Sequence, residues 1–219
     1  LKAKGLKLKN EPVVLPIFVD VKKIQSVKEK FNLHQKYPEY DFIILMASRL
    51  TKEKNIGMAI EAMKELSQRS NVKSKMLLLI VGEGPEREAL QKSIVKGQLS
   101  NVKIEPWTND LISYYKSANL FLLTSNYEGY GRTVIEAMAS GLPVIMTDVG
   151  LAEELLIDDL DGRIVPVGDK KTLAAAILEL KENPPKREEF KLNSLKLLEN
   201  WPVKKEYLEK YRNSLEMLK

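Results

Sequence analysis

The chain has 219 residues, 44% of them hydrophobic and 30% charged, which is typical of one globular α/β domain or slightly more. It contains no cysteine and one histidine, His34, so disulfide bonds, thiolate metal sites and sites that need several histidines are excluded. The lack of cysteine fits a reducing compartment, and no apolar run approaches the length of a transmembrane helix.

The formal net charge is +5, and lysines gather near both ends of the chain. A solvated basic surface is the simplest interpretation, and weak attraction to anionic lipid or nucleic acid is the alternative. Because the chain begins at Leu1 rather than Met, we expect it to be a fragment of a longer protein.

Apolar runs and amphipathic segments alternate along most of the chain. A short apolar segment, Val13–Pro16, lies in the first part. Buried strands are predicted at Phe42–Ser48, Met76–Val81, Val102–Glu105, Leu120–Thr124, Pro143–Thr147 and Gly162–Pro166. Helices are predicted at Val21–Phe31, Asn55–Arg69, Pro85–Val95, Asp110–Ser117, Val134–Ser140, Ala152–Ile157 and Asp169–Glu182, with Asp20 and Asp169 as N-caps.

Strands that alternate with helices predict an α/β fold with a Rossmann-like parallel sheet and helices on both faces. Residues 1–40 are predicted to form a link with a first strand and helix, and residues 41–182 the sheet domain. Asn183-Pro-Pro185 interrupts the helical pattern. Residues 183–219 are therefore predicted to be the C-terminal helices, with two helices over Lys186–Lys219 that are separated at Pro202.

The most informative segment, Glu128–Glu136, joins a predicted strand to a predicted helix through a Gly-rich turn. Gly129 and Gly131 allow the backbone to turn tightly, and the free N–H groups that begin the helix favour an anion such as phosphate. Glu136 leans back toward the same turn because helical side chains tilt toward the N-terminus. Both carboxylates, on Glu128 and Glu136, suit the hydroxyl groups of a sugar.

Polar groups also follow the first two predicted strands of the sheet domain. Arg49 and Lys54 flank the loop after the first strand, and an Arg fork beside a Lys charge suits a diphosphate. Gly82 and Gly84 follow the second strand. Because glycine has no side chain, this pair predicts a turn in which the backbone approaches another group closely. They are not part of a G-x-G-x-x-G dinucleotide fingerprint, because Arg87 stands where the third glycine is needed.

An Asp-x-Asp triplet, Asp159-Leu-Asp161, is of a kind that holds metal ions in other sugar-transferring enzymes. It lies in a turn before a predicted strand. We therefore interpret it as a solvated turn rather than as a metal site.

Together these motifs resemble glycosyltransferase family 4. The resemblance covers roughly Val13–Leu180 and is to the C-terminal, donor-binding half of these two-domain (GT-B) enzymes. The tail after Trp201 is similar to their last helix, so the resemblance implies that residues 183–219 return to the N-terminal domain. The residues that carry it are Ser48-Arg49-Leu50 with Lys54, Gly82-Glu-Gly84-Pro85, Glu128-Gly-Tyr-Gly131 through Glu136 to Pro143, and Thr147-Asp-Val-Gly150.

The resemblance implies a role for each matching position. Arg49 and Lys54 would hold the donor diphosphate, Glu136 would accept from the ribose hydroxyls, and Glu128 would contact the transferred sugar. Arg49, Lys54 and Glu128 are thus the implied catalytic residues. The remaining donor-binding positions are Gly82 and Gly84, Trp107 near the base, and Gly129, Tyr130, Gly131, Arg132 and Thr133, which would offer backbone amides to phosphate or sugar.

The resemblance also implies that sugar moves from a nucleotide-diphosphate sugar to a glycan or lipid-linked sugar, with retention of configuration. No cofactor or bound metal is expected, and no nucleic-acid partner. The acceptor would bind an N-terminal domain that this chain lacks, so the chain alone is expected to be inactive. The expected location is the cytoplasm, and the basic ends suggest peripheral contact with the inner face of a membrane.

Other functions are compatible with parts of the pattern. The main alternative is a stand-alone nucleotide-sugar-binding or regulatory module without transferase activity. An NAD-type oxidoreductase is disfavoured by the missing third glycine. Related reactions of the same fold, such as epimerisation or phosphorolysis of sugars, use a similar framework.

Overall fold

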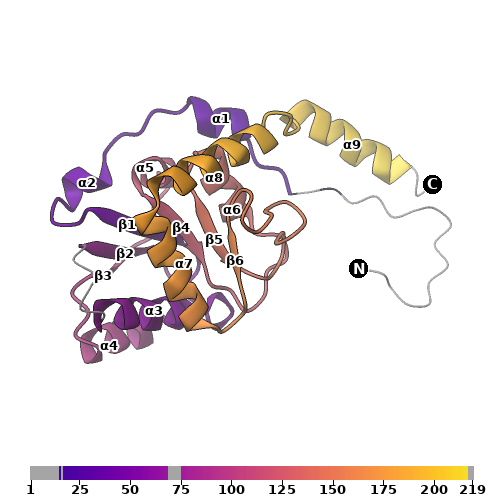
Figure 1. Ribbon diagram of the computed structural model, residues 1–219. Coiled ribbons are helices and arrows are strands. Elements are labelled where there is room, and N and C mark those ends of the chain that lie inside the picture. The colour runs from indigo at the N-terminus through magenta and orange to yellow at the C-terminus, as the bar shows by residue number, and fades with distance from the viewer. Residues whose placement is uncertain (1–14, 16, 69–74, 217–219) are drawn as a thin grey trace.

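Six parallel strands form one sheet in the part of the chain that the structure describes, residue 15 and residues 17–68 and 75–216 of a computed structural model (Figure 1). Their order across the sheet is β3-β2-β1-β4-β5-β6, and every neighbouring pair is parallel. The strands are β1 (Phe42–Ala47), β2 (Met76–Val81), β3 (Val102–Glu105), β4 (Leu120–Leu123), β5 (Val144–Thr147) and β6 (Arg163–Val165). The predicted Rossmann-like α/β fold is confirmed.

Helices cover both faces of this sheet (Figure 1). They are α1 (Val21–Ser26), α2 (Leu33–Lys36), α3 (Ile56–Gln68), α4 (Arg87–Lys96), α5 (Leu111–Ser117), α6 (Arg132–Ala139), α7 (Lys170–Glu182), α8 (Pro184–Leu197) and α9 (Lys204–Glu216), with a short 3-10 turn, η1, at Lys52–Lys54. The predicted N-caps are confirmed, since the carboxylates of Asp20 and Asp169 accept backbone N–H groups at the starts of α1 and α7.

Alternate residues of β1, β2, β4 and β5 enter two separate apolar cores. In β1, Ile44 packs in the core beneath α3, α4 and α7, and Ile43 packs in the core beneath α1, α2, α5 and α6. Strands buried on both faces must be apolar throughout, which explains the continuous apolar runs in the sequence.

The predicted helix over Val21–Phe31 is wrong in its second half. α1 ends at Ser26, Val27 is extended, and α2 begins separately after Asn32. The physical reason is tertiary, because the Lys30 N–H donates to the Ser113 hydroxyl (2.9 Å) and pulls the segment onto α5. The predicted strand near Val13–Pro16 lies outside the described residues apart from Leu15, which is in no strand.

The predicted helix over Ala152–Ile157 is also wrong. This segment is a looped turn closed by a bridge between Ala152 and Leu156, and Glu153 has a positive φ of 59°. Leu151 and Leu156 are buried on either side of the turn. Burial of both side chains fixes the loop where a continuous helix was expected.

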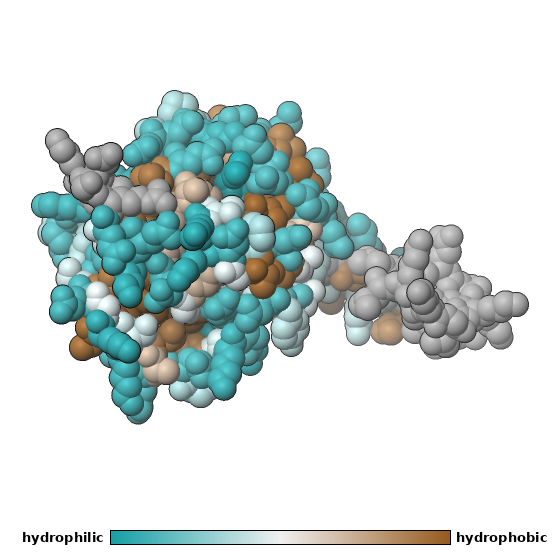
Figure 2. All heavy atoms as spheres, turned by 60° about the horizontal axis from the view of Figure 1, so that its bottom comes forward, coloured by the Kyte–Doolittle hydropathy of each residue, from teal (hydrophilic) through white to brown (hydrophobic). Residues whose placement is uncertain are grey.

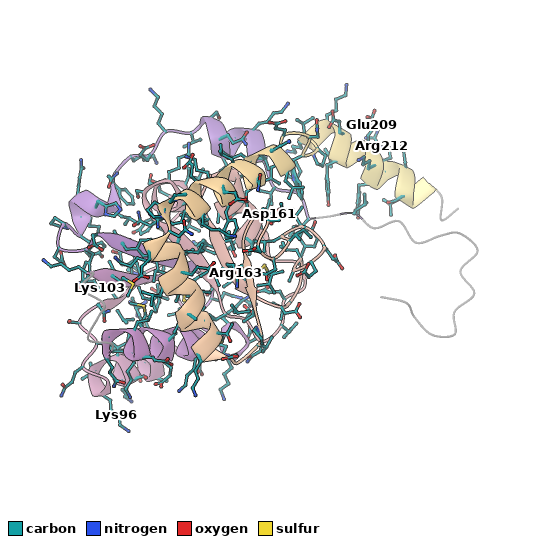
Figure 3. The ribbon with its side chains drawn as sticks, in the orientation of Figure 1. Lys96, Lys103, Asp161, Arg163, Glu209 and Arg212 are labelled. Carbon is teal, nitrogen blue, oxygen red and sulfur yellow. The ribbon has the colours of Figure 1, made fainter. Side chains whose placement is uncertain are left out.

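Asp161 does not lie in a solvated turn. It is 3% exposed, and its carboxylate accepts the Ile157 N–H (2.8 Å). Burial raises the pKa of Asp161 above its usual value, despite the hydrogen bonds it accepts from backbone N–H groups. Asp159, by contrast, is exposed and pairs with Lys186 (2.6 Å) and Arg163 (3.1 Å). Figure 3 shows Asp161 and Arg163 near the sheet edge beside α7 and α8. The triplet thus has a structural role. Asp161 binds the backbone of its own turn, and Asp159 forms ion pairs with Lys186 and Arg163.

The C-terminal helices are separated near Pro202, as predicted. α8 packs against α6 and α7, whereas Figure 1 shows α9 extending away from the sheet. Near its start, α9 contacts the segment before α1, where the rings of Tyr207 and Phe18 lie 5.3 Å apart. The predicted division at residues 40 and 182, and the return of the last helices to another domain, stay predictions.

Hydrophilic side chains dominate the face of the molecule in Figure 2, with apolar side chains in scattered patches between them. Of the helices that the structure describes, none has the length and apolar character needed to cross a membrane.

Candidate functional site

The loops that carry the predicted site residues meet at one edge of the sheet, because each follows the carboxyl end of a parallel strand. β1 and β4 are neighbours, yet α3 and α6, which follow them, lie on opposite faces. This is the switch point of the sheet, where α/β proteins bind ligands. The two loops are joined directly, since the Thr124 hydroxyl donates to the carbonyls of Lys54 and Asn55 (3.0 Å each).

An ion pair between Lys54 and Glu128 spans this switch point. Lys54 Nζ lies 2.6 Å from Glu128 Oε1, and the two side chains are only 16% and 11% exposed. The Ser125 hydroxyl donates to the same oxygen (2.7 Å). Two residues predicted to act on one ligand are therefore in contact with each other.

Arg49 pairs with a different carboxylate, that of Glu53. Its side chain is 77% exposed, and Nη2 lies 3.6 Å from Glu53 Oε1. A small cavity of about 140 Å³ is lined by Ser48, Arg49, Glu83 and Trp107. The proposed joint action of Arg49 and Lys54 on a diphosphate stays a prediction.

Gly82 and Gly84 bring the loop after β2 against the loop after β1. A Cβ on Gly82 would lie 1.9 Å from the Ser48 carbonyl oxygen, and one on Gly84 would lie 2.4 Å from that of Leu50. The close approach predicted here is thus to the protein backbone. Contact of either glycine with a donor stays a prediction.

The turn before α6 leaves helix N–H groups available. Gly131 is the N-cap residue with φ 96° and supplies no capping side chain. A Cβ on Gly129 would meet no atom within 4 Å, so the turn is open at that point. Tyr130 is half-buried, and Arg132 and Thr133 form the first positions of α6. An anion at this helix start would meet unpaired backbone donors.

A cleft of about 500 Å³ opens beside the start of α6. Four of the predicted site residues line it, Arg132, Thr133 and Glu136 of α6 and Trp107 of the segment after β3. Its other walls were not predicted from the sequence. They are Val19, Asp20, Lys23 and Ile24 around the start of α1, Thr108 and Asn109 between β3 and α5, and Leu111, Ile112 and Tyr115 of α5.

Glu136 presents its carboxylate to this cleft with a partner on each oxygen. Arg132 Nε lies 2.8 Å from Oε1, and the Tyr115 hydroxyl donates to Oε2 (3.2 Å). Burial, reinforced by the nearby carboxylate, raises the pKa of Tyr115 well above its usual value. Sequence reasoning missed Tyr115, because an aromatic residue in an amphipathic helix gives no signal that distinguishes it from the core.

A second carboxylate, that of Glu105, binds three donors at the start of the loop that leads to Trp107. Glu105 ends β3 and accepts from Lys36 (Nζ–Oε1 2.6 Å), from the Tyr37 hydroxyl and from the Tyr114 hydroxyl. Burial opposes ionisation of Glu105, but these hydrogen bonds outweigh it and hold the pKa of its carboxyl below the usual value. The cluster ties α2 and α5 to the strand end from which the loop departs.

Replacing Glu105 with glutamine is expected to lower the free energy of unfolding by about 1–2 kcal/mol at pH 7, because a charged acceptor of three donors is lost. A group with a lowered folded-state pKa stabilises the fold above its unfolded pKa and loses this effect as the pH falls through the folded one. The difference between wild type and Glu105→Gln should therefore shrink below about pH 4.

Urea unfolding from pH 3 to 7 measures this difference, with Glu88→Gln, an exposed substitution on α4, as the control. A Glu105→Gln effect that is absent at pH 7, or that does not change with pH, would show that the carboxylate is not the stabilising group.

Among the described residues, no group of three or more His, Cys, Asp or Glu side chains is placed to hold a metal ion. The expectation that the chain needs no cofactor stays a prediction.

Comparisons with known proteins agree with this arrangement. The family described as "Glycosyl transferases group 1" matches residues 27–197. The capsular polysaccharide biosynthesis glycosyltransferase CapM of Staphylococcus aureus is 32% identical over 183 residues, which cover 78% of this chain and 47% of CapM. The chain spans about a quarter to a half of the length of the curated relatives it matches.

Two solved structures have the same fold. The pneumococcal O-GlcNAc transferase GtfA, in complex with UDP and GlcNAc, superposes with a TM-score of 0.70 and 28% identity, over 82% of this chain and 36% of GtfA. The C-terminal domain of a glycosyl transferase group 1 family protein (LpcC) from Francisella tularensis superposes with a TM-score of 0.70 and 22% identity, over 83% of this chain and 96% of that domain.

Proposed function

The chain belongs to the glycosyl transferases group 1 family, and on this premise we propose that it binds the nucleotide-diphosphate sugar from which sugar is transferred. The observation that carries the proposal is the position of the cleft at the start of α6, beside Glu136 and at the same sheet edge as the Lys54–Glu128 pair. At that edge lie carboxylates that can accept hydrogen bonds from hydroxyl groups, backbone N–H groups at the start of α6 that have no capping side chain, and the ammonium group of Lys54.

The donor would lie across the switch point. Its base would enter the cleft beside Trp107, and its ribose hydroxyls would donate to Glu136. The diphosphate would meet the first N–H groups of α6 and the charge of Lys54, and Arg49 would reach it after release from Glu53.

Chemistry would follow from the change of charge on the diphosphate. As the bond to the sugar breaks, negative charge grows on the leaving phosphate oxygen, and fixed donors at that point lower the barrier. Lys54 is the best-placed side chain, because it is largely enclosed and its charge would be only weakly screened. Glu128 would turn from Lys54 to the hydroxyl groups of the transferred sugar.

The finer features of the proposal come from the resemblance to glycosyltransferase family 4. We propose transfer with retention of configuration to a glycan or lipid-linked sugar, with the acceptor bound outside this chain, so that the chain alone binds donor without transferring sugar. The name of the relative CapM, a capsular polysaccharide biosynthesis glycosyltransferase, supports a polysaccharide product. A cytoplasmic location with contact at a membrane surface is part of the same proposal.

A thermal-shift panel of UDP, GDP, ADP, CMP and NADH tests donor binding. We expect UDP to give the largest rise, since the GtfA structure contains UDP. Ligand at a hundred times its dissociation constant adds about 2.7 kcal/mol of stability, which for a chain of this size raises Tm by about 5–10 °C. No rise with any nucleoside diphosphate, or a rise with NADH alone, would contradict the proposal.

A further inference from the structure

The carboxylate of Glu136 is held from two sides that differ in rigidity. Arg132 comes from the same helix one turn earlier, and its side chain is 61% exposed. Tyr115 comes from α5 and is 2% exposed. Of these two partners, only Tyr115 is fixed by the packed interior of the protein.

The tyrosine ring is fixed by its neighbours. It packs edge-on against Phe121 of β4, with ring centroids 5.6 Å apart and an interplanar angle of 68°. Both rings belong to the core that contains α1, α2, α5 and α6. A buried hydroxyl needs a hydrogen-bond partner, and the Tyr115 hydroxyl donates to Glu136 Oε2 at the cleft wall.

Two hydrogen bonds leave the carboxylate with capacity for two more. An ionised carboxylate has about four acceptor positions. Arg132 and Tyr115 take one on each oxygen, so one remains on each. Two adjacent acceptors of this kind match the neighbouring 2′- and 3′-hydroxyl groups of a ribose.

We propose that Tyr115 is a positioning residue that fixes the Glu136 carboxylate for recognition of both ribose hydroxyls of the donor. The inference rests on the proposed function, because it takes the ligand to be a nucleoside diphosphate. Tyr115 does not touch the ribose in this scheme and acts only through Glu136. Its removal should therefore affect discrimination between ribose and deoxyribose more than general binding.

The experiment measures dissociation constants of UDP, 2′-deoxy-UDP and 3′-deoxy-UDP by calorimetry. Wild type should prefer UDP over each deoxy compound by about tenfold, the value of one hydrogen bond to a charged group. In Tyr115→Phe, the affinity for UDP, which uses both acceptors of Glu136, should fall about five- to tenfold, and the affinity for each deoxy compound, which uses one acceptor, should fall clearly less.

Tyr114→Phe is the matched control. Tyr114 is the preceding residue of the same helix and is also buried, but its hydroxyl donates to Glu105 instead of Glu136. This variant should keep the preference for ribose. Glu136→Asp is a second test of the same contact. It keeps the negative charge but shortens the side chain by one methylene, which moves the carboxylate away from the Tyr115 hydroxyl. This variant should lose the preference for UDP over the deoxy compounds.

Three outcomes would overturn the inference. The first is a Tyr115→Phe protein that keeps the wild-type preference for UDP, and the second is one that loses affinity for all three ligands equally. The third is a wild-type protein that binds UDP without any preference for ribose. Absence of binding of any nucleoside diphosphate to wild type is a different result, since it overturns the proposed function together with the inference.

Discussion

Replacing Lys54 with alanine is expected to weaken the binding of UDP by about ten- to a hundredfold, because the proposed charge-assisted contact to phosphate, made from a largely enclosed position, would be lost. Calorimetric titration measures the change. Lys52→Ala is the control, since Lys52 is an exposed lysine of the same 3-10 turn. Equal effects of the two substitutions would mean that Lys54 contributes only general positive charge.

Replacing Glu128, the partner of Lys54, is expected to change the affinity for UDP in the opposite direction. In the structure Glu128 already neutralises Lys54, so a diphosphate must compete with it. Glu128→Gln should therefore bind UDP about two- to fivefold more tightly, by the usual value of a released ion pair. The increase in affinity from UDP to UDP-glucose should be smaller in this variant than in wild type, because the glutamine amide cannot replace both carboxylate oxygens as acceptors for the sugar hydroxyl groups. Weaker UDP binding by Glu128→Gln would contradict this competition.

Replacing Gly82 with alanine is expected to lower the free energy of unfolding by about 3 kcal/mol or more, at the upper end of overpacking effects. The new Cβ would lie 1.9 Å from the Ser48 carbonyl oxygen, and the obstacle is backbone rather than a side chain that can rotate away. For a chain of this size, Tm should fall by about 6–12 °C. Chemical and thermal unfolding both measure the effect.

Gly57→Ala serves as the control for the loss of a glycine. A Cβ on Gly57 would meet no atom within 4 Å, and Gly57 lies in helix α3. Alanine there should stabilise the protein by about 0.5–1 kcal/mol. A Gly82→Ala protein as stable as wild type would mean that the loops after β1 and β2 can separate without cost.

The sheet could be predicted from the sequence because its signal is local. Each strand is a short run of apolar residues, and Phe42–Ala47 and Met76–Val81 are buried at every position. A helix between consecutive runs of this kind favours a parallel crossover connection. The loops with chemical side chains then share one edge of the sheet, and the observed pairing of β1 with β4 brings Lys54 and Glu128 together.

What could not be predicted depends on residues far apart in sequence. α1 ends early because Lys30 is bound by Ser113, 83 residues later. Ala152–Ile157 has helix-compatible residues, but burial of the leucines around it fixes a loop. Tyr115 and the α1 wall of the cleft carry no motif, and only the packing of α5 and α1 against α6 reveals their position.

The switch point has a consequence for how such a site diversifies. The Lys54–Glu128 pair is supplied by the loops after β1 and β4, whereas the cleft walls come largely from the start of α1 and the segment after β3. If the donor binds as proposed, selectivity for the base and handling of the sugar therefore depend on different segments, and a descendant sequence could alter one while inheriting the other unchanged.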